Sequence, residues 1–306
     1  MWARSCFEWI MGRTKILFPT LVTMLLWGSL FPMVKLGFAA YHVTSTADIL
    51  LFAGIRFVLC GGIICLFSLL RNRASFSAAR RSMLPILATG LFAIVLHYGF
   101  SYLGLDSIAS SKTALLKQAG PVFYVCFSFL FIREDRPTLQ KIAAAVIGFL
   151  GVVALNLTPT GVTFSMGDLL ILAASFCTVF ANVISKKVFA AVEPVTAAGI
   201  SQLFGGAVLL LAGICMGGSV QFAADRSLWI MGYICAASVV SYCLWYGVVK
   251  KGELSRLFVV KFAEPAFACA FGAVLLREDI WKLQYLAAFV LICTAVWLVN
   301  RKGKTV

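Results

Sequence analysis

Long apolar runs separated by short polar connections make up almost the whole chain. A helix needs about 20 apolar residues to cross the roughly 30 Å hydrocarbon layer of a bilayer. The runs lack the period-two alternation of barrel strands, and backbone groups in hydrocarbon must bond within their own segment. The pattern therefore predicts ten transmembrane helices, at residues 15–36, 46–69, 83–104, 109–131, 138–155, 166–189, 194–216, 227–249, 254–276 and 280–300.

The composition agrees with a membrane protein. Hydrophobic residues make up 61% of the 306 residues, charged residues make up 12%, and the mean hydropathy is +0.97. A water-soluble domain cannot bury so much apolar side chain, because its surface needs polar cover. The net charge of +14 would suit a nucleic-acid-binding protein, but here the basic residues lie between apolar runs. We therefore expect an all-α integral membrane protein with no nucleic-acid partner.

Lysine and arginine are distributed unevenly between the two sides of the predicted bundle. If the N-terminus is cytoplasmic, seventeen basic residues fall on the cytoplasmic side and five on the opposite side. Cytoplasmic loops are enriched in Lys and Arg, and an even number of helices returns the chain to the side where it started. We expect two cytoplasmic tails, 1–14 and 301–306, on a multi-pass protein of a bacterial plasma (inner) membrane.

The chain matches itself at an offset of 144 residues. The matched polar positions are Tyr98, Tyr102, Lys117, Pro121 and Arg133-Glu134-Asp135 in the first half, and Tyr242, Tyr246, Lys261, Pro265 and Arg277-Glu278-Asp279 in the second. Each half, 15–156 and 157–300, holds five predicted spans, so the second half enters the membrane from the opposite side. Such inverted-topology repeats are typical of secondary transporters, whose halves open a midplane site to either side in turn.

Several short motifs also lie at characteristic places in the spans. They are Trp27-Gly28-Ser29, Lys35, Arg56, Pro121, Arg133-Glu134, Gly148, Gly151, Glu264-Pro265 and Arg277-Glu278. Together they resemble the drug/metabolite transporter superfamily, and within it the ten-helix EamA-like carriers. Span six departs from that pattern at Phe176 and Cys177, and span ten lacks the glycine pair. The resemblance implies a carrier for amino acids, nucleotide-linked compounds or other small metabolites, with proton coupling or exchange in many members.

Several charged residues lie inside the predicted spans, where a charge is energetically costly. The four that lie at mid-span, well away from the span ends, are Arg56, Lys117, Lys261 and Glu264. Lys261 and Glu264 are three positions apart and can pair on one helix face, either as part of a site or as an ion pair that holds the bundle. Two cations remain, and a ligand, water or loss of a proton must neutralise them. This excess favours a substrate with a carboxylate or phosphate, although Arg56 could instead bond backbone carbonyls or snorkel.

Further polar and aromatic residues complete the candidate substrate site. They are Trp27, Tyr98, Tyr102, Gln118, Asn182, Tyr242 and Tyr246. The tyrosines could stack on a flat substrate, or they could belong to the core or to an aromatic belt. Glu264 is a candidate for proton coupling, as is His97, although a lone histidine is commonly a satisfied interior residue. Pro121 and Pro265 are predicted hinges, because proline frees the carbonyl four residues earlier.

These features favour a secondary active transporter of a small organic metabolite, such as an amino acid or another compound with a carboxylate or phosphate, working by alternating access. Proton coupling and exchange both stay open. The alternatives are an exporter of cationic or hydrophobic compounds and a non-transport scaffold or channel. An intramembrane enzyme is disfavoured, because the chain has two histidines and no HExxH or GxSxG motif. We expect no metal or cofactor, partners limited to a small-molecule substrate and the bilayer, and a monomer or homodimer.

Overall fold

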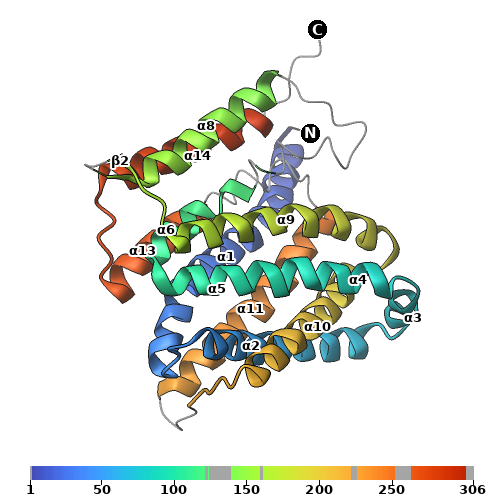
Figure 1. Cartoon of the computed structure of the whole chain (residues 1–306). Helices are drawn as coiled ribbons and strands as arrows, with labels where there is room; N and C mark the ends of the chain where they lie inside the picture. The colour runs from blue at the N-terminus through green and yellow to red at the C-terminus, as the bar shows by residue number, and fades with distance from the viewer. Residues whose placement is uncertain are drawn as a thin grey trace.

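The computed structural model of the chain describes residues 2–120, 123, 139–158, 161–221, 226–251 and 263–300. Nearly all of them are helical. The helices are α1 (Trp2–Ala40), α2 (Thr46–Arg71), α3 (Ala74–Arg81), α4 (Met83–Gly90), α5 (His97–Ser107), α6 (Ser110–Leu116), α8 (Leu139–Leu155), α9 (Met166–Ala191), α10 (Pro194–Cys215), α11 (Arg226–Lys251), α13 (Ala263–Leu276) and α14 (Leu283–Asn300). A π-helical turn, η1 (Leu91–Leu96), joins α4 to α5, and the short strands β1 (Leu157–Thr158) and β2 (Gly161–Val162) pair antiparallel between α8 and α9 (Figure 1).

Most described helices coincide with the predicted spans. Six stretches of the described chain are long and apolar enough to cross a membrane: Phe18–Ala40, Thr46–Arg71, Met83–Ser107, Met166–Ser185, Pro194–Cys215 and Ser227–Trp245. Shorter apolar helices lie at Ile142–Leu155, Ala263–Leu276 and Leu283–Ala295. The prediction of an all-α, multi-span membrane protein is confirmed, whereas the count of ten spans stays a prediction.

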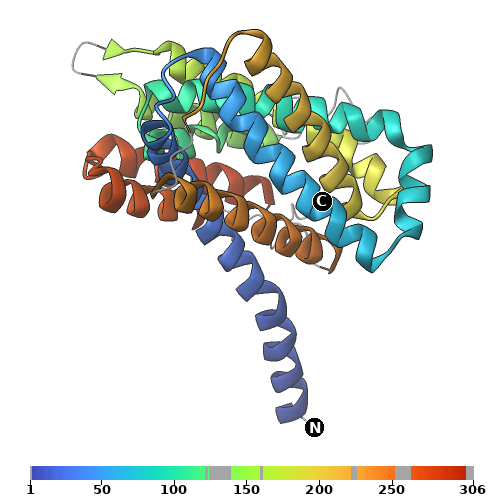
Figure 2. The same ribbon diagram turned by 90° about the horizontal axis from the view of Figure 1, so that it is seen from below.

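The structure differs from the predicted spans in three places. The N-terminal tail expected at 1–14 is helical from residue 2 onward, and α1 projects beyond the bundle (Figure 2). Span three contains the π-helical turn η1, which hydropathy does not reveal. The connection after α2 forms the short helix α3, which was not expected because it is too short and polar to cross a membrane.

The fourth predicted span is not one continuous helix. α6 ends at Leu116, and the chain turns at Lys117 and Gln118. Pro121 lies outside the described residues, but proline has no N–H with which to bond the Lys117 carbonyl. That carbonyl instead accepts from the Gly120 amide at 3.1 Å and from the Ser175 hydroxyl at 3.5 Å. Lys117 therefore lies at a break in the span, where a proline is expected to free a carbonyl, and the hinge role of Pro121 stays a prediction.

Helices α2 and α10 pack closely against each other and run antiparallel. Gly54 lies against Leu210 and Gly61 lies against Leu203, so residue numbers rise along one helix as they fall along the other. α2 and α10 are equivalent in the 144-residue repeat. Equivalent helices of an inverted repeat cross the membrane in opposite directions, whereas those of a parallel repeat share one direction. The α2–α10 pair therefore has the orientation that inverted halves require.

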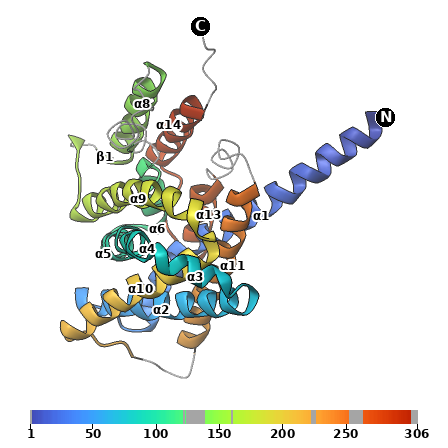
Figure 3. The same ribbon diagram turned by 90° about the vertical axis from the view of Figure 1, so that its right-hand side faces the viewer.

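Other helix contacts also map onto one another when the first half is shifted by 144 residues onto the second. α1 packs on α11, and α5 packs on α9. A shift of 144 residues maps α1 onto α9 and α5 onto α11, so the first pair corresponds to the second. α8 packs on its own equivalent, α14, and these two helices lie side by side at one edge of the bundle, away from α2 and α10 (Figure 3). The contact pattern thus repeats along with the sequence.

Replacing Gly54 by alanine is expected to lower the stability of the protein. A Cβ atom at Gly54 would overlap the backbone of Leu210, so the α2–α10 contact would have to open, and overpacking of this kind costs about 1–3 kcal/mol. Gly62→Ala is the matched control, because nothing lies within 4 Å of a Cβ there. Alanine also favours a helix over glycine by about 1 kcal/mol. Thermal unfolding in detergent should give a lower Tm for Gly54→Ala and an equal or higher Tm for Gly62→Ala, and equal losses would contradict the packing argument.

Candidate functional site

Two tyrosines that are equivalent in the repeat meet in the interior of the bundle. The hydroxyl of Tyr98 on α5 lies 2.8 Å from the hydroxyl of Tyr242 on α11. Equivalent residues can touch only close to the axis that relates the two halves, so this pair marks the pseudo-two-fold axis. Inverted repeats form their site near the midplane, where the halves meet. The residues around Tyr98 and Tyr242 are therefore the candidate site.

Arg56 projects from α2 toward this pair and is only 1% exposed. Its guanidinium donates hydrogen bonds to the hydroxyls of Tyr102 and Ser238, the latter at 2.8 Å. The guanidinium carbon lies 4.8 Å from the ring centroid of Phe57 and 5.6 Å from that of Tyr98. Burial rules out snorkelling, and the two bonded partners are side-chain hydroxyls, not backbone carbonyls. Within the described part of the chain, no carboxylate pairs with Arg56, and its Nε has no hydrogen-bond partner.

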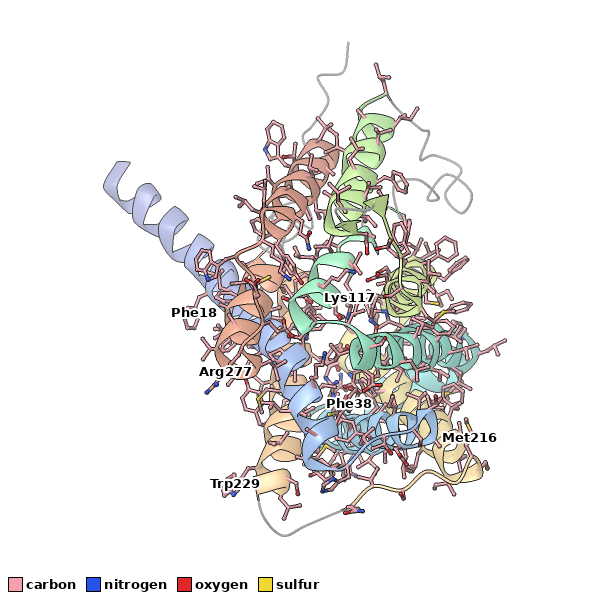
Figure 4. All side chains as sticks on the ribbon, turned by 60° about the vertical axis from the view of Figure 1, so that its left-hand side comes forward. Phe18, Phe38, Lys117, Met216, Trp229 and Arg277 are labelled. Atoms are coloured by element: carbon pink, nitrogen blue, oxygen red, sulfur yellow. The ribbon has the colours of Figure 1, made fainter. Side chains whose placement is uncertain are left out.

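Lys117 brings a second positive charge to the same tyrosine. Its Nζ lies 5.0 Å from the ring centroid of Phe31 and 5.5 Å from that of Tyr98. Lys117 points into the interior, whereas Arg277 and Trp229 point away from the bundle (Figure 4). An aromatic face attracts a cation through its quadrupole but does not cancel its charge. Arg56 and Lys117, which are far apart in the sequence, thus lie beside one ring.

Aromatic rings and one carboxylate complete the cluster. The ring centroid of Trp27 lies 5.8 Å from that of Tyr242 and 5.3 Å from that of Trp245. The Nε1 of Trp27 is buried and has no hydrogen-bond partner among the residues described. Glu264, which is buried, lies where α13 packs against α1 next to Trp27. As far as the structure describes the chain, the cluster therefore combines two cations, one acid and several flat apolar surfaces.

The imidazole of His97 is within hydrogen-bond distance of two groups on α9, and its role in proton coupling stays a prediction. Its Nδ1 lies 2.8 Å from the carbonyl oxygen of Ala174 and 3.1 Å from the hydroxyl of Thr178, both on α9. These contacts are those of a satisfied interior histidine, the alternative considered from the sequence. The imidazole ring nevertheless stands edge-on to Tyr98 with centroids 4.7 Å apart, so His97 supports the position of the tyrosine at the axis.

The structure describes only some of the remaining predicted site residues. Gln118 is buried directly after Lys117, and Pro265 is buried in α13. Lys261 and Pro121 lie outside the described residues, as do the side chains of Asn182 and Tyr246. The Lys261–Glu264 ion pair therefore stays a prediction. In the described ranges, no group of three or more His, Cys, Asp or Glu side chains is arranged to hold a metal ion.

Some residues of the cluster were not singled out from the sequence, and three of them contact the two cations. Ser238 bonds Arg56, Phe31 lies under Lys117, and Phe57 lies under Arg56. Ser238 precedes Tyr242 by four positions and Phe31 follows Trp27 by four, so both share a helix face with a predicted site residue. That spacing is a signal that could have identified them.

Comparisons with known proteins agree with this architecture. The sequence profile of the EamA-like transporter family matches residues 14–157 and 165–301, and the gap between the two matches contains β2. The chain is similar to YvbV of Bacillus subtilis, described as an uncharacterized transporter, with 27% identity over 301 residues that cover 95% of this chain and 93% of that protein. It is also similar to YedA of Escherichia coli K12, described as an uncharacterized inner membrane transporter, with 24% identity over 281 residues that cover 89% and 86%.

A solved crystal structure has the same fold. It superposes with a TM-score of 0.66 at 18% sequence identity, and the match covers 94% of this chain and 96% of that chain. The likeness thus extends over both halves.

Proposed function

Because the chain belongs to the EamA-like transporter family, we propose that this membrane transporter is a secondary carrier of a small organic anion or zwitterion, such as an amino acid or another compound with a carboxylate or phosphate. In this proposal the halves 15–156 and 157–300 open the central cluster alternately to the two sides of a plasma (inner) membrane, and both termini are cytoplasmic. The observation that carries the charge preference is the buried Arg56 guanidinium, which has no carboxylate partner among the described residues.

A buried cation whose hydrogen-bond partners are neutral hydroxyls favours binding of an anion. Taking a charge out of water costs several kcal/mol unless an opposite charge compensates it. The hydroxyls of Tyr102 and Ser238 orient the Arg56 guanidinium but leave its charge in place. An entering carboxylate or phosphate would find an unused donor in the Arg56 Nε and a point charge in Lys117.

The aromatic rings and the acid of the cluster suit the parts of such a substrate that lie beyond its carboxylate or phosphate. The rings of Trp27, Tyr98 and Tyr242 provide flat apolar surface next to the two cations. Glu264 is the buried acid of the cluster and would either pair with a substrate ammonium group or carry a coupled proton. If Glu264 carries a coupled proton, a pH gradient would drive transport. If Glu264 instead pairs with a substrate ammonium group, the gradient would have no effect.

The runner-up function is export of a cationic or hydrophobic compound. The observations that favour it are the same buried Glu264 and the ring faces of Trp27 and Trp245. The two cations beside Tyr98 argue against it, because each repels a positively charged substrate.

Ligand stabilisation tests the proposal. L-Aspartate, L-phenylalanine and glycerol 3-phosphate are added to purified protein, with tetraphenylphosphonium as a cationic comparison. A ligand at a hundred times its Kd stabilises by about 2.7 kcal/mol, which should raise Tm by about 5 °C or more. We expect an anionic or zwitterionic probe to give a saturable shift and to undergo counterflow in liposomes. A shift with tetraphenylphosphonium alone would favour the cation exporter instead.

A further inference from the structure

Glu278 connects the two halves outside the central cluster. It lies in the segment between α13 and α14 and reaches α6 of the first half. One oxygen of its carboxylate accepts the backbone N–H of Ser110 at 2.6 Å, and the other accepts that of Ser111 at 2.9 Å. Bonds from N–H groups to an ionised carboxylate are about twice as strong as those between neutral groups. Both oxygens of one half-buried side chain are thus bonded to the other half.

The backbone around Glu278 is shaped to allow this contact. Arg277 has a φ of 54°, in the left-handed region that non-glycine residues rarely adopt. After this turn the Glu278 amide donates to the Gly272 carbonyl at 3.2 Å. A Cβ at Gly272 would come within 2.7 Å of the Glu278 carboxylate and 3.0 Å of the Ser110 hydroxyl. Such strain persists only where the surrounding structure fixes it, so the contact is a built feature of the fold.

α6 links this contact to the candidate site. It has only seven residues, from Ser110 to Leu116, and Lys117 follows directly. A second contact with the other half lies in the same turn, where Lys112 forms an ion pair with Asp168 of α9 at 2.8 Å. The segment is therefore held to the second half at its first turn and presents Lys117 to Phe31 and Tyr98 at its last.

We propose that Glu278 is a positioning residue for Lys117: it fixes α6 against the second half and ties the two halves together at this end of the bundle. The inference rests on the proposed function for the role of Lys117. Because donor and acceptor belong to different halves, any motion that separates the halves at this end must break both bonds.

The protonation of Glu278 should change the strength of this tie. Burial raises the pKa of the Glu278 carboxyl, but the bonds from Ser111 and Ser110 outweigh that effect, so its pKa lies below the usual value. The other titratable groups that face it are Cys269 of α13 and Tyr285 of α14, with Asp279 beside it.

The difference in Tm between the parent protein and E278Q should therefore depend on pH. A lowered folded-state pKa gives a contribution that is present above the ordinary glutamate pKa of about 4.3. This contribution is lost as the pH falls through the folded-state value. We expect the Tm difference to be largest near neutral pH and to shrink in acid. A difference that stays constant with pH would contradict the assignment of an ionised Glu278.

Hydrogen–deuterium exchange of the full chain in nanodiscs tests the tie directly. D279N is the matched control, because the contacts of the neighbouring Asp279 carboxylate with described residues stay within its own connection. It accepts a hydrogen bond from the Trp281 amide at 3.2 Å and forms an ion pair with Lys282 at 3.8 Å. In E278Q we expect the amides of Ser110 and Ser111 to exchange about tenfold faster, the factor for losing one charge-assisted hydrogen bond. α2 and α10 should not change, and D279N should match the parent. Unchanged exchange in E278Q would overturn the proposal.

The same variants separate this inference from the proposed function. E278D keeps the charge on a shorter side chain, so its amide exchange should fall between those of the parent and E278Q, even if E278Q folds poorly. L-Aspartate titrated against Tm should show an apparent Kd about tenfold weaker in E278Q than in D279N. If E278Q shows faster exchange of the Ser110 and Ser111 amides but an unchanged Kd for L-aspartate, Glu278 ties the halves together but does not position Lys117. A parent protein that no anion stabilises would refute the proposed function and leave the exchange result standing.

Discussion

Lys117→Ala is expected to abolish the rise in Tm that an anionic ligand produces. The Nζ of Lys117 lies over the rings of Phe31 and Tyr98, where it would meet a ligand carboxylate away from bulk water. Removing one partner of such a charge contact costs about 2–5 kcal/mol, which weakens binding by at least about thirtyfold. The loss of its cation–π contacts should cost the unliganded protein about 1 kcal/mol. Differential scanning fluorimetry with increasing ligand measures both quantities.

Lys282→Ala is the control for this experiment, because Lys282 lies in an exposed connection and its ion pair within the described part of the chain is with Asp279. It removes the same charge far from the Tyr98–Tyr242 pair and should retain the full ligand shift. Lys117→Arg keeps the charge and should bind the ligand more weakly than the parent but better than Lys117→Ala. An undiminished shift in Lys117→Ala would remove Lys117 from the site.

Hydropathy predicts the positions of most helices because the bilayer sets a fixed length for each span. Thr46–Arg71 and Pro194–Cys215 agree closely with the predicted spans 46–69 and 194–216. The break at Lys117 agrees with a local rule, since the proline four residues later cannot donate a hydrogen bond. The π-helical turn at Leu91–Leu96 has no such signal, because its residues are as apolar as those of any regular span.

The repeat located the candidate site, but it could not supply the contacts within it. The sequence match makes Tyr98 and Tyr242 equivalent residues of the two halves. The hydrogen bond between them is the contact expected near the axis of an inverted repeat. Ser238 lies 182 residues from its partner Arg56, and no local pattern connects them. The packing of α11 against α2 brings these two distant positions together.

Arg56→Met is expected to weaken anion binding by about a hundredfold or more while the unliganded protein stays folded. Arg56 is the buried cation to which both the Tyr102 and Ser238 hydroxyls are oriented, so its loss removes the strongest contact with a ligand carboxylate or phosphate. Methionine fills much of the same volume without a charge. Removing a buried charge also removes its burial penalty of several kcal/mol, so the unliganded variant should be at least as stable as the parent. Tm without ligand and Kd with ligand measure the two effects separately.

The double variant Arg56→Met/Tyr102→Phe serves as the control for the hydroxyl that Arg56→Met leaves behind. An unsatisfied buried hydroxyl costs about 1–3 kcal/mol, so the double variant should be more stable than the single one. Ser238 needs no matching change, because its hydroxyl also donates to the Ile234 carbonyl at 2.6 Å. A structural role for Arg56 predicts the opposite result: both variants would lose several kcal/mol of stability, and the Tyr102 change would recover none of it. Because a ligand-binding arginine and a structural one differ in the sign of this stability change, the comparison decides between them even before the natural substrate is identified.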